Sequence, residues 1–210
     1  MAQTKSLSQF KSRLAGGGAR PNLFEVTMPA FPSAVADAWG GGDQAESGTF
    51  KFLCKAAALP ASVVASYNVP FRGRNLKIAG DRTFNPWTVT IINDEDFQLR
   101  TAFERWANTI SKLDDATGVT NPSSYMTDAY VTQLGRGAER FATSNSGGES
   151  VVLRTYKFFD IFPTQVGAIE LSYDNGDQLE EFDVTFDVQL FTIGESDQNS
   201  GGNANEVLIR

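Results

Sequence analysis

The sequence predicts a mainly β protein, an antiparallel β-sandwich or barrel with one packed α-helix. Three observations support this class. Phe and Val dominate the apolar positions beyond the N-terminal region, and there are 16 Phe in 210 residues. Several short segments alternate apolar and polar residues, which is typical of strands with one buried face. Only one segment after residue 20 has a clear helical period. We therefore expect about seven to nine strands around a single core.

The clearest strand pattern lies near the C-terminus, at residues 180–192. Apolar side chains alternate there with polar ones, and Asn175-Gly176 precedes them as a hairpin turn. We expect this strand to pair with residues 168–173, and residues 162–167 to form a short connector. The other segments expected to be extended are 22–28, 49–55, 62–69, 74–79, 88–93, 129–135 and 151–161.

The expected helix covers residues 97–113, after Asn93 or Asp94 as its cap and two more acidic residues at its positive end. One apolar stripe recurs at steps of three and four residues and should pack on a sheet. A polar turn at 80–87 precedes this region and ends in a Trp. The stripe comprises Leu99, Phe103, Trp106, Ile110 and Leu113, and the expected core anchors are Trp87, Phe103 and Trp106.

The expected domain organisation has three parts. Residues 1–18 form an N-terminal arm, residues 19–192 form the β-domain, and residues 193–210 form a flexible C-terminal extension rich in Gly, Asn and Ser. A long loop at 29–48 is inserted in the β-domain. Because long loops are often functional and this one carries Trp39, we expect it to contact a partner.

The composition argues against most catalytic, metal-binding and phosphate-binding functions. The net charge of −7 argues against a protein that grips nucleic-acid phosphates. The absence of His removes the commonest general base and metal ligand, and the single Cys54 can form neither an internal disulfide nor a zinc site. The Gly runs lack the residues of a phosphate loop. We expect that the protein is not an enzyme and that it binds no cofactor, metal or small-molecule substrate.

Targeting signals are also missing from the sequence pattern. No apolar run approaches the roughly 18 residues of a membrane span, and the first residues lack the apolar core of a signal peptide. We expect a soluble protein that is made in a cytoplasm.

Seven short segments occur in a collinear order that resembles a known family. They include Arg20-Pro21-Asn22-Leu23-Phe24 near the start and Phe162-Pro163-Thr164-Gln165 near the end. Taken together they resemble the tail tube protein of contractile-tailed (myovirus) bacteriophages. The segments are 19–26, 54–61, 79–84, 87–90, 93–95, 162–167 and 182–186.

The resemblance implies a structural subunit of a virion tail. In that family six subunits close into a ring, and stacked rings form a hollow tube inside a contractile sheath. The implied partners are the sheath, baseplate, tape-measure and tail terminator proteins, and double-stranded DNA passes through the lumen without specific binding. The chain departs from shorter members in its longer loop at 29–48, its unmatched residues 1–18 and its extra residues after 192.

Two sets of site residues are predicted. Arg72, Arg74 and Arg82 lie near one another in the sequence, which points to inter-subunit pairing with the many carboxylates, and a phosphate site is the alternative. An alternating acidic face points to a lumen wall that repels DNA, and an ordinary solvated outer face is its alternative. The predicted inter-subunit residues are Arg20, Trp39, Arg72, Arg74, Asp81 and Arg82. The predicted lumen residues are Glu181, Asp183, Asp187 and Gln189.

Two other functions fit the same sequence. The fold also resembles the tube protein of type VI secretion systems and extracellular contractile injection devices, in which the cargo is protein. A β-sandwich module that binds carbohydrate is the third reading, with Trp39 as its one candidate aromatic.

Overall fold

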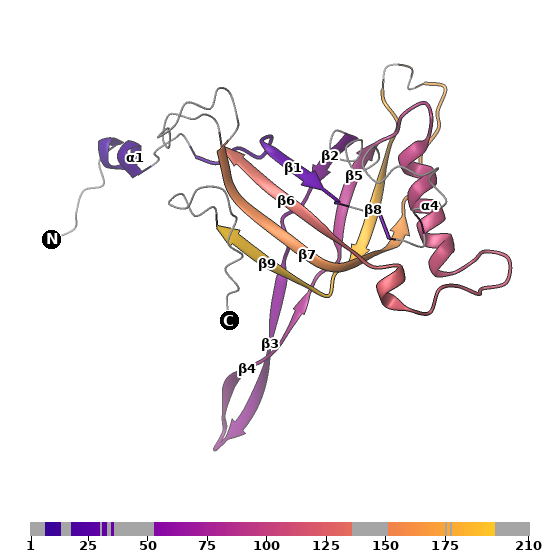
Figure 1. The fold of residues 1–210 in the computed structure, drawn as a ribbon. Coiled ribbons are helices and arrows are strands. Elements are labelled where there is room, and N and C mark those ends of the chain that lie inside the picture. Colours follow the sequence, from indigo (N-terminus) through magenta and orange to yellow (C-terminus); the bar gives the residue numbers. More distant parts are fainter. Residues whose placement is uncertain are drawn as a thin grey trace. The chain divides into compact units, whose positions relative to one another are not determined.

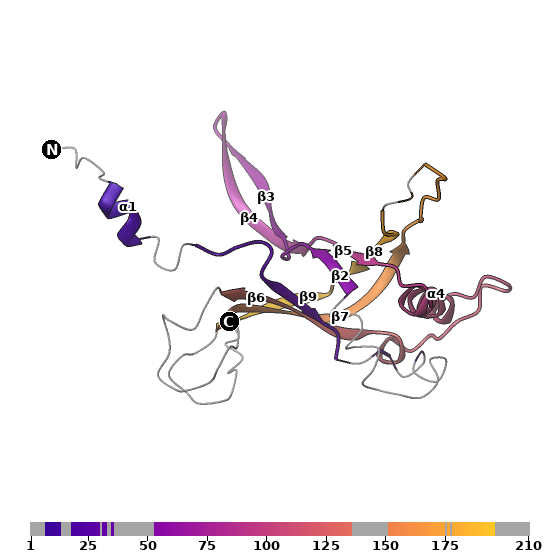
Figure 2. The same cartoon turned by 90° about the horizontal axis from the view of Figure 1, so that it is seen from above.

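The computed structural model describes residues 7–13, 18–29, 31–32, 35, 53–135, 151–174, 176 and 178–195. The chain divides into two compact units. One comprises residues 1–25, 132–155 and 193–210, and the other comprises residues 26–131 and 156–192. Most of the features below belong to the second unit. Figures 1 and 2 show its sheet, the helix Gln98–Ile110 and a long two-stranded hairpin.

Two sheets account for the strands of the described chain. The larger has seven strands in the order β1-β6-β7-β8-β5-β2, with β9 paired to β7, and the smaller is the hairpin β3-β4. The mainly β class, an antiparallel sheet with few helices, is therefore confirmed. The elements are α1 (Leu7–Arg13), β1 (Phe24–Thr27), β2 (Cys54–Ala57), β3 (Ser62–Phe71), β4 (Arg74–Phe84), β5 (Trp87–Ile92), α4 (Gln98–Ile110), the 3₁₀ turn η3 (Pro122–Ser124), β6 (Thr127–Gly135), β7 (Val151–Val166), β8 (Glu181–Asp187) and β9 (Leu190–Glu195).

The core of the second unit lies between α4 and the central antiparallel pair β5-β8. Trp87 pairs with Phe186 at one end of β5, and Ile92 pairs with Glu181 at the other. Alternation sends the apolar residues of both strands to the face that α4 covers. The Phe103 ring of α4 lies 5.9 Å from the ring of Phe186 in an edge-to-face arrangement, which is a favourable aromatic geometry.

Helix α4 is shorter than the sequence predicts. The residue that precedes its first turn is Phe97 (φ 53°) and not the predicted cap Asn93 or Asp94, although the Asp94 carboxylate accepts a hydrogen bond from the Gln98 backbone N–H (3.2 Å). The helix ends at Ile110, and Leu113 is 92% exposed rather than part of the buried stripe. The chain reverses there, and a Cβ at Gly118 would lie only 2.0 Å from the Ile110 carbonyl oxygen. That close approach requires glycine.

Several secondary-structure predictions are wrong. The expected turn at 80–87 is mostly strand, because β4 continues to Phe84. Residues 168–173 are a loop, because the long strand β7 continues to Val166 through the expected connector. The expected strand at 180–192 breaks in two: β8 ends at Asp187, whose carboxylate accepts a hydrogen bond from the Val188 N–H, and β9 begins at Leu190.

Some predictions fall outside the described residues. They include Trp39 and most of the 29–48 loop, the first part of the 49–55 strand, and the ends of the chain at 1–6 and 196–210. Within the described part, no helix is long and apolar enough to span a membrane.

Candidate assembly surfaces

The β3-β4 hairpin has one apolar and one polar face. Opposite residues of an antiparallel pair share a face, and Tyr67 lies opposite Ile78 while Val69 lies opposite Leu76. Phe71 completes this side at the end of β3. The alternate positions carry Asn68 opposite Lys77 and Pro70 opposite Asn75. We call Tyr67, Val69, Phe71, Leu76 and Ile78 the apolar hairpin face.

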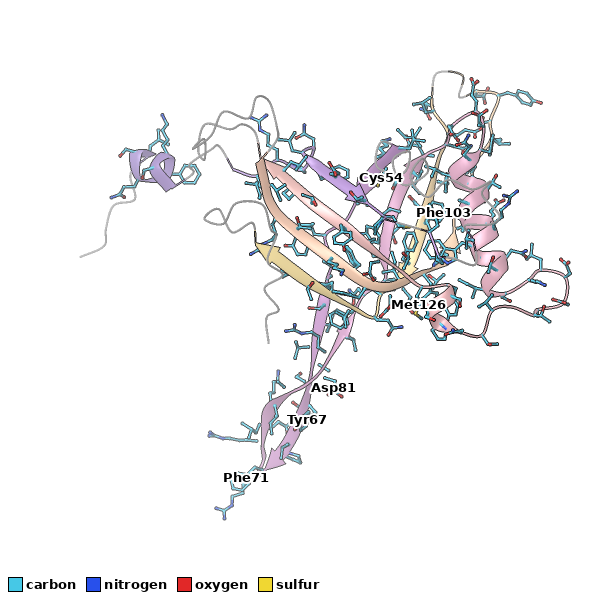
Figure 3. All side chains as sticks on the ribbon, viewed as in Figure 1. Cys54, Tyr67, Phe71, Asp81, Phe103 and Met126 are labelled. Atoms are coloured by element: carbon cyan, nitrogen blue, oxygen red, sulfur yellow. The ribbon has the colours of Figure 1, made fainter. Side chains whose placement is uncertain are left out.

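The apolar hairpin face is open to solvent. Phe71 is 68% exposed and Leu76 is 61% exposed, and every residue of β3 is classed as exposed. Figure 1 shows the hairpin extending from its unit, and Figure 3 shows Tyr67 and Phe71 along it, away from the core residue Phe103. A contiguous exposed apolar surface of this kind marks a site of contact between proteins.

The tip of the hairpin is a tight two-residue turn among basic residues. Arg72 (φ 45°) and Gly73 (φ 79°) both have positive φ, as the turns that match strand twist require. The Arg72 guanidinium lies 5.4 Å from the centre of the Phe71 ring. Arg74 and Lys77 follow, and residues 62–80 contain no Asp or Glu. No ion pair joins Arg72 or Arg74 to a carboxylate among the residues that the structure describes.

The base of the hairpin is held to the core. The Asn85 N–H donates to the Ala61 carbonyl (3.1 Å), and the Trp87 indole N–H donates to the Ala58 carbonyl (2.9 Å). The Phe84 ring contacts the Phe191 ring edge-to-face at 5.4 Å. These contacts fix the base of the hairpin to the core.

A β-bulge lies between this base and the tip. The register shifts between Val64 and Ser66, opposite Gly80, where a Cβ would lie 3.3 Å from the Ala65 carbonyl oxygen. Asp81 and Arg82 follow on β4 and are both exposed. Successive strand residues face opposite sides, so the predicted pair does not act as one patch.

The second surface is the side of β2, β5 and β8 that faces away from α4. Thr90 donates to the Asp183 carboxylate (2.7 Å), the Thr88 and Thr185 hydroxyl oxygens lie 3.0 Å apart, and Lys55 forms an ion pair with Glu181. Asp187 completes the row. We call these side chains of β2, β5 and β8 the polar sheet face. It carries one cation and three carboxylates.

The predicted site residues thus fall in several places. Arg72, Arg74, Asp81 and Arg82 all lie on the hairpin. Arg20 is exposed in the other unit, where its carbonyl accepts a hydrogen bond from the Gln133 side chain. Glu181, Asp183 and Asp187 share the polar sheet face, whereas Gln189 lies in the bend after β8. The three anchors Trp87, Phe103 and Trp106 are buried.

One surface was not anticipated from the sequence. The loop 168–180, between β7 and β8, exposes the large apolar side chains of Leu171, Tyr173 and Leu179. The alternation of residues 168–173 predicts a strand, whereas the structure places them in a loop. Within the described residues, no group of three acidic, Cys or His side chains is placed to hold a metal ion.

An exposed apolar hairpin and a hydrogen-bonded polar sheet face are typical of a subunit that assembles with other protein chains. Comparison with known proteins identifies its family. The family model described as phage tail tube protein matches residues 19–193, and the chain belongs to this family.

Two curated relatives illustrate the similarity. The chain is 32% identical over 171 residues to tail tube protein gp19 of Enterobacteria phage T4, which covers 81% of this chain and 89% of the T4 protein. It is 26% identical over 188 residues to the tail tube protein of Serratia phage KSP90, which covers 89% of this chain and 94% of the relative.

Solved structures share the fold at lower identity. The tube-terminating cap of the anti-feeding prophage superposes with a TM-score of 0.54 at 16% identity, over 85% of this chain and 92% of the other. The sheath/tube terminator of an extracellular contractile injection system (PVC) superposes with a TM-score of 0.52 at 12% identity, over 84% and 96%. These likenesses concern the fold.

Proposed function

We propose that this protein is the repeating subunit of the inner tube of a contractile phage tail, in which copies close into hexameric rings and the rings stack. Family membership supports the tube. The observation that carries the proposal is the apolar hairpin face, since a soluble monomer gains nothing from holding Phe71 and Leu76 in water. A second copy covers this face in the assembled tube.

Ring closure uses the edges of the larger sheet. Among the described strands, β1 and β2 end the strand order and each has one neighbour, and β9 pairs with β7 alone. Exposed strand edges are a hazard in a monomer, and pairing between copies in a closed ring removes them. The predicted domain 19–192 supplies these edges, and β9 extends the sheet to Glu195, three residues beyond the predicted boundary.

The polar sheet face lines the lumen in this proposal. α4 covers the opposite side of the β5-β8 pair, so the face with Asp183 and Asp187 is the one left for a solvent channel. Carboxylates repel DNA phosphates, and the hydroxyl groups of Thr88 and Thr90 are already engaged in hydrogen bonds within the sheet. Double-stranded DNA therefore passes without specific binding.

The remaining partners follow from the role. A tube inside a contractile tail contacts the sheath, the baseplate, the tape-measure protein and a terminator, and it resides in the virion after synthesis in the host cytoplasm. The sheath/tube terminator with the same fold is consistent with a shared assembly plan.

Negative-stain microscopy of the purified full-length protein tests the proposal. We expect six-fold rings or hollow tubes whose abundance rises with protein concentration. Compact monomers alone at high concentration, with normal strand content by circular dichroism, would overturn it.

A further inference from the structure

We propose that the N-terminal arm of one copy of the chain docks, through its helix α1, on the loop 168–180 of a second copy. The inference rests on the proposed function, because a tube brings many copies together. The arm, residues 1–18, lies outside the residues 19–193 that the family model matches. Membership of the family therefore supplies no partner for this segment.

Helix α1 has an apolar side that is open to solvent. Leu7 and Phe10 are both more than 60% exposed. They are three residues apart, and Lys11 is four residues from Leu7, so the three side chains share one side of the helix. A helix of seven residues is marginal in water on its own. Helix α1 is therefore stable only where its apolar side packs on another surface.

The loop 168–180 has an exposed apolar surface of its own. Tyr173 is fully exposed, and Leu171 and Leu179 are more than two-thirds exposed. Since both apolar surfaces are uncovered in a single chain, the arm that covers the loop comes from a second copy. An amphipathic helix that lays its apolar side on the apolar surface of another protein is a common mode of recognition.

The loop is held at both of its ends by the segment that begins α4. The Arg100 guanidinium donates a hydrogen bond to the Gly167 carbonyl oxygen, just before the loop. At the other end, the Asn93 side chain donates to the Glu180 carboxylate (3.0 Å), and the Asn93 N–H donates to the Glu180 carbonyl oxygen (2.9 Å). The loop therefore has a fixed base beside the start of α4, where Phe97 is also exposed.

The charges of the two surfaces are opposite. Residues 1–20 contain four cations and no carboxylate, whereas residues 94–97 and 168–180 together contain seven carboxylates and no Lys or Arg. The whole chain has 25 acidic and 18 basic residues, so these seven carboxylates equal its entire excess of negative charge. Among the described residues, no ion pair engages Lys11, Glu170 or Asp174. Complementary potentials of this kind select partners and fix how they dock.

The chain between α1 and the sheet is long enough for the arm to reach a neighbour. Ten residues, 14–23, separate the end of α1 from the start of β1. Extended backbone covers at most about 35 Å over ten residues, which is slightly more than the diameter of a small domain. An arm of this length reaches from its own domain to the next.

Disulfide trapping tests the contact in the full chain. The arm partner carries Phe10→Cys, the loop partner carries Tyr173→Cys, and both carry Cys54→Ala. Equal amounts are mixed, assembled and oxidised. Ser12→Cys replaces Phe10→Cys in the control, because Ser12 lies about 200° around the same helix from Phe10. Since a disulfide forms only when the two Cα atoms approach within about 7 Å, we expect about five times more linked dimer from the arm partner than from the control.

Charge reversal tests the electrostatic part of the same contact. Lys11→Glu with Arg13→Glu in the arm partner should lower the dimer yield about tenfold. Glu170→Lys with Asp174→Lys in the loop partner should lower it to a similar extent. The mixture of the two reversed partners has complementary charges again and should regain the dimer. An unchanged yield with either reversal alone, or no recovery in the mixture, would overturn the inference.

The remaining outcomes also decide the inference. Equal dimer yields from Phe10→Cys and Ser12→Cys would overturn it. A chain that carries both Phe10→Cys and Tyr173→Cys and closes its disulfide only within one molecule would overturn it as well, because the arm would then cover its own loop. Tubes that form normally without trapped dimer would overturn the inference and leave the proposed function standing. Failure of the unsubstituted protein to form rings or tubes would count against the proposed function, and against this inference with it.

Discussion

Trp87 donates a hydrogen bond from its indole N–H to the carbonyl oxygen of Ala58, 2.9 Å away. Ala58 precedes the hairpin and Trp87 follows it, so this bond joins the two chain segments between which the hairpin is inserted. The Trp87 ring is buried and stacks on Phe158 at 4.5 Å. The exposed hairpin is thus held by one of the best-packed side chains of the core.

Replacing Trp87 should destabilise the fold. We expect Trp87→Phe to lower the free energy of unfolding by about 1 kcal/mol through the lost hydrogen bond, and Trp87→Ala to lower it by about 3–5 kcal/mol through the added cavity. Urea unfolding of unassembled protein, followed by circular dichroism, measures both. Phe71→Ala is the control, since this exposed ring should change the value by less than about 0.5 kcal/mol.

Arg82→Ala should separate folding from assembly. Arg82 is exposed on β4 opposite Val64, and no ion pair joins it to a carboxylate in the described part of the chain. We expect unfolding free energy within about 0.5 kcal/mol of the parent and a lower yield of tubes. Sedimentation of assembled material gives the yield, with Lys112→Ala as an exposed control. Tubes of normal yield and stability would remove Arg82 from the interface.

Asp183→Lys with Asp187→Lys tests the lumen. Both carboxylates lie on the polar sheet face, outside the core, so tube length should remain normal. Fixed cations would hold DNA phosphates by releasing their counterions, and genome delivery by phage carrying this variant should slow. Time-resolved DNA release is the measurement, and Asp183→Asn, which keeps an acceptor for Thr90, is the control. Delivery at the normal rate would assign this face to the outside of the tube.

Cys54 provides a pH-dependent prediction. Burial raises the pKa of the Cys54 thiol from 9.0 to about 12, against a smaller opposing effect of its contact with the Ala56 carbonyl. Between these values the folded chain keeps a proton that the unfolded chain releases, so stability falls as the pH rises above about 9. We expect a shallower alkaline loss in Cys54→Ala. Thiol-reagent labelling at pH 8 should be slow in the fold and fast in urea, and fast labelling of folded protein would contradict this burial.

The central sheet and helix followed from the sequence because one core dictates both patterns. Phe182, Val184 and Phe186 alternate on β8, and Leu99, Phe103 and Trp106 recur on α4, since all six meet the same interior. The end of α4 could not be predicted from the same pattern. Leu113 continues the helical spacing, but the reversal at Gly118 ends the helix three residues earlier.

The hairpin β3-β4 and the loop at 168–173 are harder to predict from the sequence, because neither packs in the core. The hairpin β3-β4 stands outside the core, so its segment from Gly80 to Phe84 has no alternation of buried and exposed side chains. Its polar residues therefore predict a turn. In residues 168–173 the alternation is present without a partner inside the described chain.

The most direct test of the central claim compares the two faces of the hairpin. Tyr67→Ser with Leu76→Ser removes large groups from the apolar hairpin face, and Asn68→Ser with Asn75→Ser alters the opposite face to a similar extent. Electron microscopy at matched concentration should show tubes for the second variant and none for the first, with unfolding free energies within about 0.5 kcal/mol of the parent for both. Tubes of normal length from the Tyr67→Ser, Leu76→Ser protein would contradict the claim that another copy covers this face.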